Sequence, residues 1–240
     1  MEVTQFHGIT SRGKSMIKLI NFGKYYNNQV ILKDVNLEIP DNKITFIMGK
    51  NGAGKTTLVK CLLGLEEYVG QIQYNSGIPQ EESTRRMLAV WDEFPFYDGM
   101  TGINNLYVFS EGLKSQKEIF KIAQKYLGKE ILKRKVKNYS YGQRKKLSLI
   151  LIEILEPKIV IMDEVSNGLD YETMVYLKKY IRELAKSATV VLMGHQFEFY
   201  NDLIEEMIII KNGSVKILEK DFQNSGYQLE EMYEEELYCE

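Results

Sequence analysis

The chain has 240 residues, which is enough for one sizeable α/β domain that carries an inserted subdomain. Its 31 basic and 33 acidic side chains leave a net charge of −2, a balance that argues against a nucleic-acid-binding protein. Two cysteines exclude a disulfide framework, and no apolar run reaches the roughly 18–20 residues that span a bilayer, so we expect a soluble protein of a reducing cytosol.

The chain begins with a polar stretch and then changes to β-like runs. Residues 1–15 lack the apolar core of a secretory signal, so we expect a flexible extension, with Met16 as an alternative start. Strand-like runs follow at residues 17–22, 30–39 and 43–48. From Ile31 to Ile39, alternate residues of the second run are mostly apolar, which is the period of a half-buried strand.

The rest of the chain alternates between strand-like and helix-like runs. We expect strands at residues 71–74, 87–90, 158–163, 188–194 and 206–218. We expect helices at residues 56–65, 101–113, 116–132, 142–155 and 173–187. A helical block at about residues 95–155 interrupts the alternation, so the pattern predicts an α/β fold with a parallel core sheet and an inserted helical subdomain.

The end of the chain is acidic. Residues 219–240 end in the twelve-residue segment LEEMYEEELYCE, in which six residues are glutamates. We favour a solvated acidic tail here, and a short amphipathic helix is the alternative.

A glycine-rich loop carries the first chemical signal. The segment GKNGAGKTT fits the Walker A pattern G-x-x-x-x-G-K-[ST], between a strand-like run and a helix-like run. Such a loop curls bare backbone N–H groups around a phosphate, and the following helix points its positive end at the same anion. Its residues are Gly49, Lys50, Asn51, Gly52, Ala53, Gly54, Lys55, Thr56 and Thr57. We expect Lys55 to reach the β- and γ-phosphates of ATP and Thr56 to ligate Mg²⁺.

A second acidic site follows the apolar run KIVIM. Asp163 and Glu164 come directly after this run, where phosphoryl transfer needs carboxylates that hold Mg²⁺ and position water. We assign Asp163 to the Mg²⁺ ion and Glu164 to the attacking water. A charged pair that ends a core strand is the structural alternative.

Between these motifs lies a possible anion-binding helix start, YSYGQRKKL (residues 139–147). It resembles the LSGGQ signature of ATP-binding cassette (ABC) proteins, with Ser140, Gly142 and Gln143 retained. Tyr139 and Tyr141 depart from the commonest Leu and first Gly. A serine that only caps a helix would explain the same letters.

The resemblance to ABC ATP-binding subunits extends from Met16 to about Leu218 and implies a P-loop NTPase fold with a RecA-like core sheet and an antiparallel β subdomain. Residues 167–170 resemble the D-loop, and His195 resembles the switch histidine that contacts the γ-phosphate. Tyr26 matches the aromatic residue that stacks on adenine, with Tyr25 as the alternative.

Two positions depart from the family pattern. Counting back from Phe96 and Tyr97 places Asp92, or alternatively Glu93, where the family has a glutamine that senses Mg²⁺. Val165 replaces the proline that usually follows the Walker B glutamate. We expect activity to survive both changes.

The resemblance also implies partners. Family members bind ATP between two head-to-tail subunits, so we expect a second copy or a paralogue, and separate permease chains at the cytoplasmic face of the membrane. An aromatic cluster formed by Trp91, Phe94, Phe96 and Tyr97 is a candidate groove for a permease helix. We favour an exporter ATPase; the alternatives are a soluble ATPase machine and a regulatory or immunity ATPase with weak hydrolysis.

Overall fold

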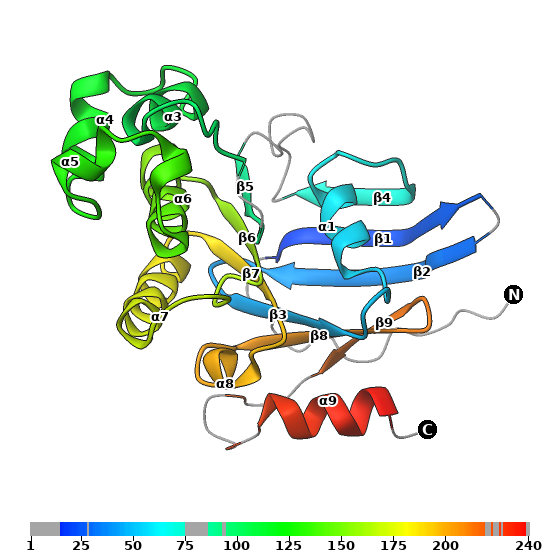
Figure 1. Cartoon of the computed structure of the whole chain (residues 1–240). Coiled ribbons are helices and arrows are strands. Elements are labelled where there is room, and N and C mark those ends of the chain that lie inside the picture. Colours follow the sequence, from blue (N-terminus) through cyan, green and yellow to red (C-terminus); the bar gives the residue numbers. More distant parts are fainter. Residues whose placement is uncertain are drawn as a thin grey trace, which may run out of the picture.

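The computed structural model describes residues 15–27, 29–74, 86–92, 95–218, 222, 226 and 228–238. The predicted N-terminal extension therefore lies almost wholly outside the described residues, as do Glu93 and Phe94. Figure 1 shows a sheet-based core with a group of helices set apart at its upper left.

The core is a six-stranded sheet in the order β5-β6-β7-β3-β8-β9. All neighbouring pairs are parallel except β8 with β9. The strands are β3 (Ile44–Gly49), β5 (Met87–Val90), β6 (Ile159–Asp163), β7 (Thr189–Met193), β8 (Glu206–Lys211) and β9 (Ser214–Leu218). The inner strands β3, β6 and β7 are apolar along nearly their whole length because both faces of the sheet are covered.

The two faces of this sheet have separate cores. Phe46 and Met48 pack with residues of α7 (Tyr171–Ala185), α8 (Phe197–Tyr200) and α9 (Leu229–Tyr238) on one face. Ile47, between them, points to the other face, which α1 (Lys55–Leu62) and a second sheet cover.

The second sheet is antiparallel, in the order β2-β1-β4, as the resemblance implies. Its strands are β1 (Ser15–Tyr26), β2 (Gln29–Pro40) and β4 (Val69–Tyr74). The expected alternation from Ile31 is wrong at the start of β2, where Leu32 is buried instead. A bulge causes the change: Asp34 has a φ of 51°, and three residues of β2 span two of β1.

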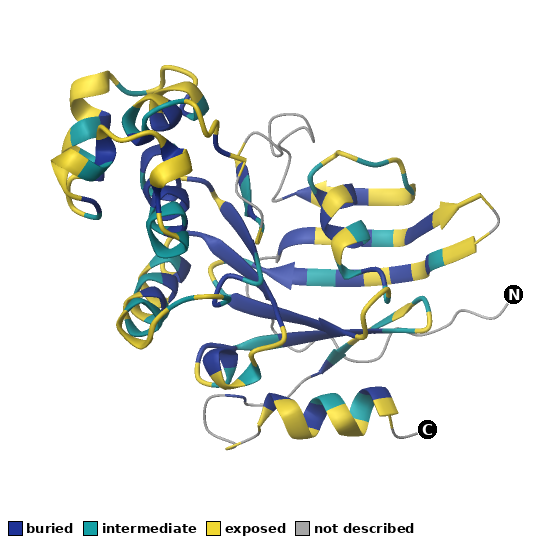
Figure 2. Cartoon of the chain, in the orientation of Figure 1, coloured by how far each residue is buried: buried dark blue, intermediate teal, exposed yellow. Residues whose placement is uncertain are grey.

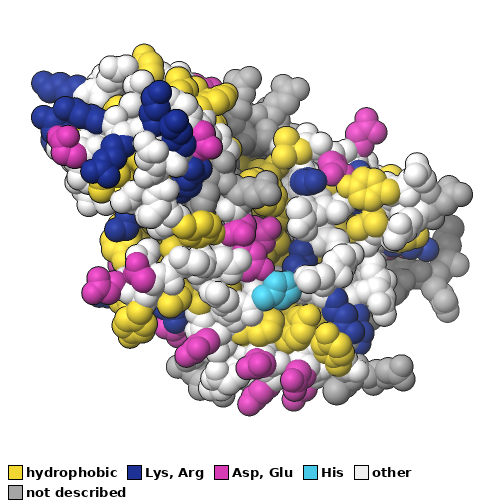
Figure 3. Space-filling view, in the orientation of Figure 1, with side chains coloured by type: hydrophobic (Ala, Val, Ile, Leu, Met, Phe, Trp, Pro, Cys, Tyr) yellow, Lys and Arg dark blue, Asp and Glu magenta, His cyan; other side chains and the backbone are white. Residues whose placement is uncertain are grey.

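The helical subdomain has a core of its own, built from the apolar faces of its helices. The helices are α3 (Gly102–Phe109), α4 (Gln116–Ala123), α5 (Lys129–Leu132) and α6 (Tyr141–Leu155). Residues 116–132, expected to be one helical run, form two helices, and Gly128 is the N-cap of the second. Lys and Arg side chains gather on this subdomain in Figure 3.

Two C-terminal expectations need correction. The run at residues 206–218 is a hairpin of two strands, because Asn212 and Gly213 both have positive φ (51° and 77°) and form the turn. The acidic end is the helix α9 rather than a solvated tail: its apolar residues fall on one side, and Leu229, Met232 and Leu237 are buried. Figure 2 shows its buried and exposed sides.

Among the described residues, no helix combines the length and the apolar character that crossing a membrane requires.

Candidate active site

Three loops with predicted site residues follow neighbouring strands of the core sheet. The Walker A loop follows β3, the acidic pair follows β6, and His195 follows β7. These strands are adjacent and parallel, so their carboxyl ends meet at one edge of the sheet. On this face of the molecule, a histidine lies beside acidic side chains in the middle of the surface (Figure 3).

The Walker A loop is tightly built. Gly54 is the N-cap of α1 with a φ of 106°, a conformation that side chains other than glycine rarely adopt. At the other end, a Cβ on Gly49 would lie 2.9 Å from the carbonyl oxygen of Ile210. No side chain caps α1, so the backbone N–H groups of its first turn are available to an anion.

Lys55 is drawn into this loop. Its Nζ donates hydrogen bonds to the carbonyl oxygens of Gly49 and Lys50, at 2.6 and 3.2 Å. Burial lowers the pKa of Lys55, and the charges of Asp163 and Glu164 act against that shift. The ammonium group therefore lies between the loop and the acidic pair.

The acidic pair ends β6. Glu164 has a φ of 51°, which is uncommon for a glutamate, and its backbone N–H donates to the carbonyl oxygen of Met193 at 3.0 Å. Burial raises the pKa of Asp163, and Glu164 raises it further, while Lys55 lowers it. Asp92 also raises it, so this carboxylate lies close enough to repel Asp163.

This arrangement fits a cation that arrives with phosphates. Mutual repulsion among the carboxylates is a cost that a divalent cation would remove. Within the described residues, no three His, Cys, Asp or Glu side chains form a metal cage. Mg²⁺ commonly takes one or two protein ligands and completes its shell with substrate phosphates and water, and Asp163 and the Thr56 hydroxyl, which we assigned to Mg²⁺, would be such a set.

His195 connects the other two loops. Its Nε2 lies 3.0 Å from Asn51 Oδ1 and 3.8 Å from Glu164 Oε1. Its backbone N–H donates to Glu164 Oε2 at 3.3 Å. The structure thus brings together Asn51, Glu164 and His195, which the sequence placed in separate motifs.

The signature residues form a helix cap in this structure. Ser140 is the N-cap of α6: its hydroxyl accepts from the Gln143 N–H at 3.3 Å, and Gln143 Oε1 accepts from the Ser140 N–H at 3.1 Å. A Cβ on Gly142 would meet no atom within 4 Å, so there is free space beside this glycine. The structural alternative, a capping serine, therefore describes the geometry of the single chain.

Tyr141, the departure from the signature, links two candidate regions. Its hydroxyl donates to Asp92 Oδ1 at 2.5 Å. Its ring lies over the D-loop, where a Cβ on Gly168 would come within 3.1 Å of it. Asp92, which we assigned to Mg²⁺, is thus held by the signature helix.

Lys145 is a residue that sequence analysis missed. It lies in a charged run, yet it is 1% exposed, with its Nζ 5.3 Å from the centre of the Tyr141 ring. Burial lowers its pKa, while Asp92, Asp163 and Glu164 raise it. The available signal was its spacing, four residues after Tyr141 on the same helix face.

The candidate adenine residues lie at the end of β1. The Tyr26 hydroxyl donates to Glu66, whose carboxylate is also 3.0 Å from Lys24 Nζ, and Tyr26 also hydrogen-bonds with Thr57. The hydrogen bond with Glu66 raises the pKa of Tyr26, while the one with Thr57 acts against that shift. The hydrogen bonds from Tyr26 and Lys24 lower the pKa of Glu66. Tyr25 turns back over Gly23, and both tyrosines are about 40% exposed.

Comparison with known proteins agrees with this geometry. The family model described as ABC transporter matches residues 32–167, more than half of the chain. The chain belongs to the ABC transporter family. It is 30% identical over 228 residues to the lantibiotic transport ATP-binding protein SrtF of Streptococcus pyogenes, covering 94% of this chain and 99% of SrtF.

Two further relatives show the breadth of the ABC family. The methionine import ATP-binding protein MetN of Campylobacter jejuni is 28% identical, over 83% of this chain and 69% of its own length. A solved structure titled as an ATP-binding subunit of an ABC transporter superposes with a TM-score of 0.79 at 23% identity, covering 92% of this chain and 99% of that one. The predicted α/β P-loop fold and the identity of this protein as an ABC ATPase are therefore confirmed.

Proposed function

We propose that this ABC ATPase powers an exporter, and that ATP closes two subunits head to tail. The observation that carries the proposal is the convergence of Asn51, Glu164 and His195, beside Lys55 and Asp163, at one edge of the core sheet. This edge combines an anion-binding loop with an acidic pair, and enzymes of phosphoryl transfer use both kinds of group.

Each loop has its own part in binding ATP. The first-turn N–H groups of α1 and the Lys55 ammonium hold the phosphates, and Lys55 leaves its loop carbonyls to do so. Thr56 and Asp163 hold Mg²⁺, which neutralises charge on the phosphates when it is bound. The ring of Tyr26 or Tyr25 stacks on the base, worth only about 1 kcal/mol.

Hydrolysis depends on the acidic pair and the histidine. Glu164 positions the attacking water and accepts its proton. The His195 N–H to Glu164 Oε2 hydrogen bond and the Glu164 N–H to Met193 bond hold that carboxylate in place. The His195 side chain contacts the γ-phosphate, and Asn51 steadies its ring.

The signature completes the site of a second subunit. Ser140 and Gly142 present the positive end of α6 to an anion. In a head-to-tail dimer, this end faces ATP bound by the Walker A loop of a second copy or a paralogue. Tighter contact with the γ-phosphate favours the closed dimer, and hydrolysis releases it.

The test of this function is Glu164→Gln. Removing the positioned base lowers turnover by about 10²–10⁴. ATP binding remains, so ATP holds the variant as a dimer in size-exclusion chromatography. Wild-type turnover in the variant would contradict the role of Glu164. A wild-type protein that itself hydrolyses ATP negligibly would favour the regulatory alternative.

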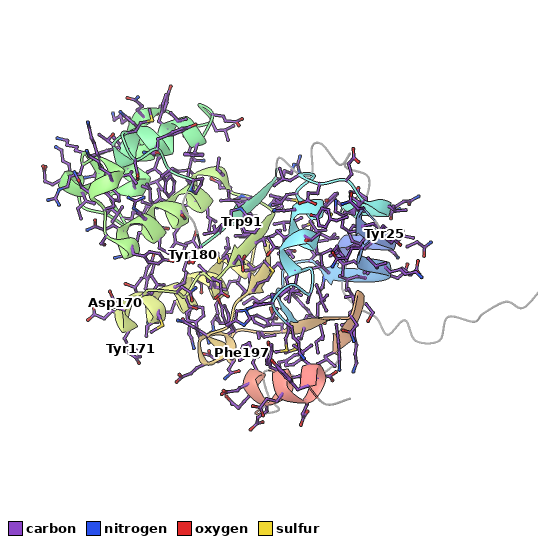
Figure 4. All side chains as sticks on the ribbon, turned by 45° about the vertical axis from the view of Figure 1, so that its right-hand side comes forward. Tyr25, Trp91, Asp170, Tyr171, Tyr180 and Phe197 are labelled. Carbon is purple, nitrogen blue, oxygen red and sulfur yellow. The ribbon has the colours of Figure 1, made fainter. Side chains whose placement is uncertain are left out.

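The membrane partner docks beside the helical subdomain. Of the aromatic cluster, Phe96 is buried against Phe109 and serves the subdomain core, whereas Tyr97 is 56% exposed. Trp91, labelled in Figure 4, directly follows β5 and packs partly against the core. Tyr97 stacks on Phe109 of α3, and Tyr107 and Val108 of the same helix are exposed, which supports an apolar permease contact at the cytoplasmic face of the membrane.

Tyr97→Ala tests this surface. We expect it to weaken co-purification with the permease and to reduce ATPase stimulation by the permease about tenfold, because it removes an exposed anchor. Turnover of the isolated subunit stays near wild type. Tyr176→Ala, at an exposed tyrosine of α7, is the matched control. Equal losses in both variants would count against the docking surface.

Export rests on likeness to SrtF, while MetN is an importer by its name. Transport by inverted vesicles that carry the permease distinguishes the two directions. Uptake of substrate into inverted vesicles supports export.

A further inference from the structure

The helix α9 reaches the candidate active site through a row of aromatic rings. The His195 ring centre lies 6.3 Å from that of Phe197, which lies 5.1 Å from that of Tyr233. Tyr233 is 5.8 Å from Tyr238, at the end of the same helix. Figure 4 shows Phe197 on the side of the core that α9 covers.

The row returns to the Walker A loop at its far end. Lys50 Nζ lies 3.8 Å from the centre of the Tyr238 ring. The next residue, Asn51, contacts His195 Nε2 at 3.0 Å. The contacts therefore form a closed circuit through the phosphate loop, the loop after β7, and α9.

The aliphatic residues of α9 are more deeply buried than its rings, although Tyr233 also packs partly against the core. Leu229, Met232 and Leu237 are its buried residues. Tyr238 is 63% exposed, yet Lys50 Nζ lies over its ring in a cation–π contact. The aliphatic positions of α9 thus hold the helix on the core, while Tyr233 reaches the loop after β7 through Phe197 and Tyr238 contacts Lys50.

We propose that Phe197, Tyr233 and Tyr238 are positioning residues for ATP hydrolysis. Phe197 and Tyr233 support the His195 ring, and Tyr238 supports the Lys50 corner of the phosphate loop. This inference rests on the proposed function, because it assigns the rings to the γ-phosphate end of that site. It makes α9 a part of the ATPase machinery.

The expected kinetic effect follows from what each ring touches. The phosphates are bound by the phosphate loop and Lys55, and the rings that Tyr233 contacts are Phe197 and Tyr238. Loss of Tyr233 therefore leaves ATP affinity nearly unchanged. A misplaced His195 slows the chemical step, because small displacements of a reacting contact cost up to about 10²-fold. Tyr238 steadies the loop itself, so its loss raises the KM for ATP.

Paired variants test the proposal in the full-length protein. Tyr233→Leu keeps an apolar side chain and removes the ring; we expect kcat to fall about tenfold or more with little change in KM. Tyr233→Phe keeps the ring and behaves like wild type. Tyr238→Ala raises the KM, and Tyr238→Phe restores it. Tyr176→Leu, in a separate tyrosine cluster of α7, is the control and leaves both constants unchanged.

A second measurement does not depend on hydrolysis. The chain has two histidines, so NMR of the imidazole Hε1 protons gives two signals, and a His7→Gln variant identifies that of His195. Tyr233→Leu should shift the His195 signal in the protein without nucleotide, and Tyr176→Leu should not.

The outcomes separate the two proposals. Wild-type protein without ATPase activity would refute the proposed function, while the NMR shift would still report the aromatic support. Normal kcat and an unmoved His195 signal in Tyr233→Leu would overturn the positioning role. Equal kcat losses in Tyr233→Leu and Tyr176→Leu would also overturn it, by showing a general effect of losing a tyrosine.

Discussion

The surroundings of Asp163 disfavour its ionised form. Burial and Glu164 raise its pKa above the ordinary value near 3.8, and Lys55 offsets only part of this. In the window between the ordinary and the raised pKa, the folded protein holds a proton that the unfolded chain has released. Stability therefore falls as pH rises through that window, and at neutral pH the ionised carboxylate destabilises the fold without its cation.

We predict that Asp163→Asn melts at a higher temperature than wild type at pH 7 in the absence of nucleotide. The amide removes the repulsion with Glu164 but also a Mg²⁺ ligand. Mg-ATP should therefore raise the Tm of the wild type and leave that of the variant nearly unchanged. Thermal melting with and without Mg-ATP checks both parts. A variant that melts lower than wild type without nucleotide would refute the account of Asp163.

Single residues were predictable where a motif fixed their place on the chain. Lys55, Asp163 and His195 each follow a short apolar run, and such runs form the inner strands of this sheet. Lys145 was not predictable in the same way, because burying a lysine depends on the groups that distant segments bring to it. From the sequence alone, a lysine between Arg144 and Lys146 is expected to be exposed to solvent.

At the scale of elements, two helices begin with the same device. Ser115 with Glu118 starts α4, and Ser140 with Gln143 starts α6, each as a reciprocal capping box. The α6 cap is made by Ser140 and Gln143 of the same chain. Local geometry therefore separates the structural part of Ser140 from any part in ATP binding.

We predict that Ser115→Ala and Ser140→Ala cost similar stability, about 1 kcal/mol each, because each removes one N-cap. Only Ser140→Ala should lose ATPase activity, by about tenfold or more, since of the two helices only α6 would face ATP in the proposed dimer. Urea unfolding and steady-state turnover measure the two effects. Matching turnover in both variants would reduce Ser140 to a capping residue.

The sequence predicted most strands and helices, and its errors have local causes. A bulge at Asp34 moved the buried side of β2 from Ile31 to Leu32. The turn at Asn212 and Gly213 could have been predicted from the sequence, since Asn-Gly is typical of a tight hairpin. The many glutamates of α9 obscured its apolar face in the sequence. Packing of that face on the core is what stabilises the helix.

At the scale of the whole molecule, the proposed dimer divides each site between two chains. One chain supplies the Walker A loop and the other supplies Ser140. A variant in Lys55 and a variant in Ser140 therefore damage opposite halves of the site. Combined in one dimer, they leave one site with both halves intact.

We predict that Lys55→Ala and Ser140→Ala are each nearly inactive and regain activity when mixed. Random exchange makes half of the dimers mixed, each with one intact site of two, so about a quarter of wild-type turnover returns. Turnover measured against mixing ratio should peak at equal amounts. No gain on mixing, with subunit exchange shown by labelled chains, would exclude a head-to-tail site.

The position of β3 in the sheet has a consequence for how the protein is made. β3 lies between β7 and β8, which come from residues 189–211 and are synthesised well over a hundred residues after it. Pairing strands so far apart in the chain is slow, because a long loop must close first. In a nascent chain on the ribosome, the phosphate loop is thus exposed long before the strands that pair with β3 are made. Nucleotide binding therefore stabilises the fold only after β7 and β8 have emerged from the ribosome and paired with β3.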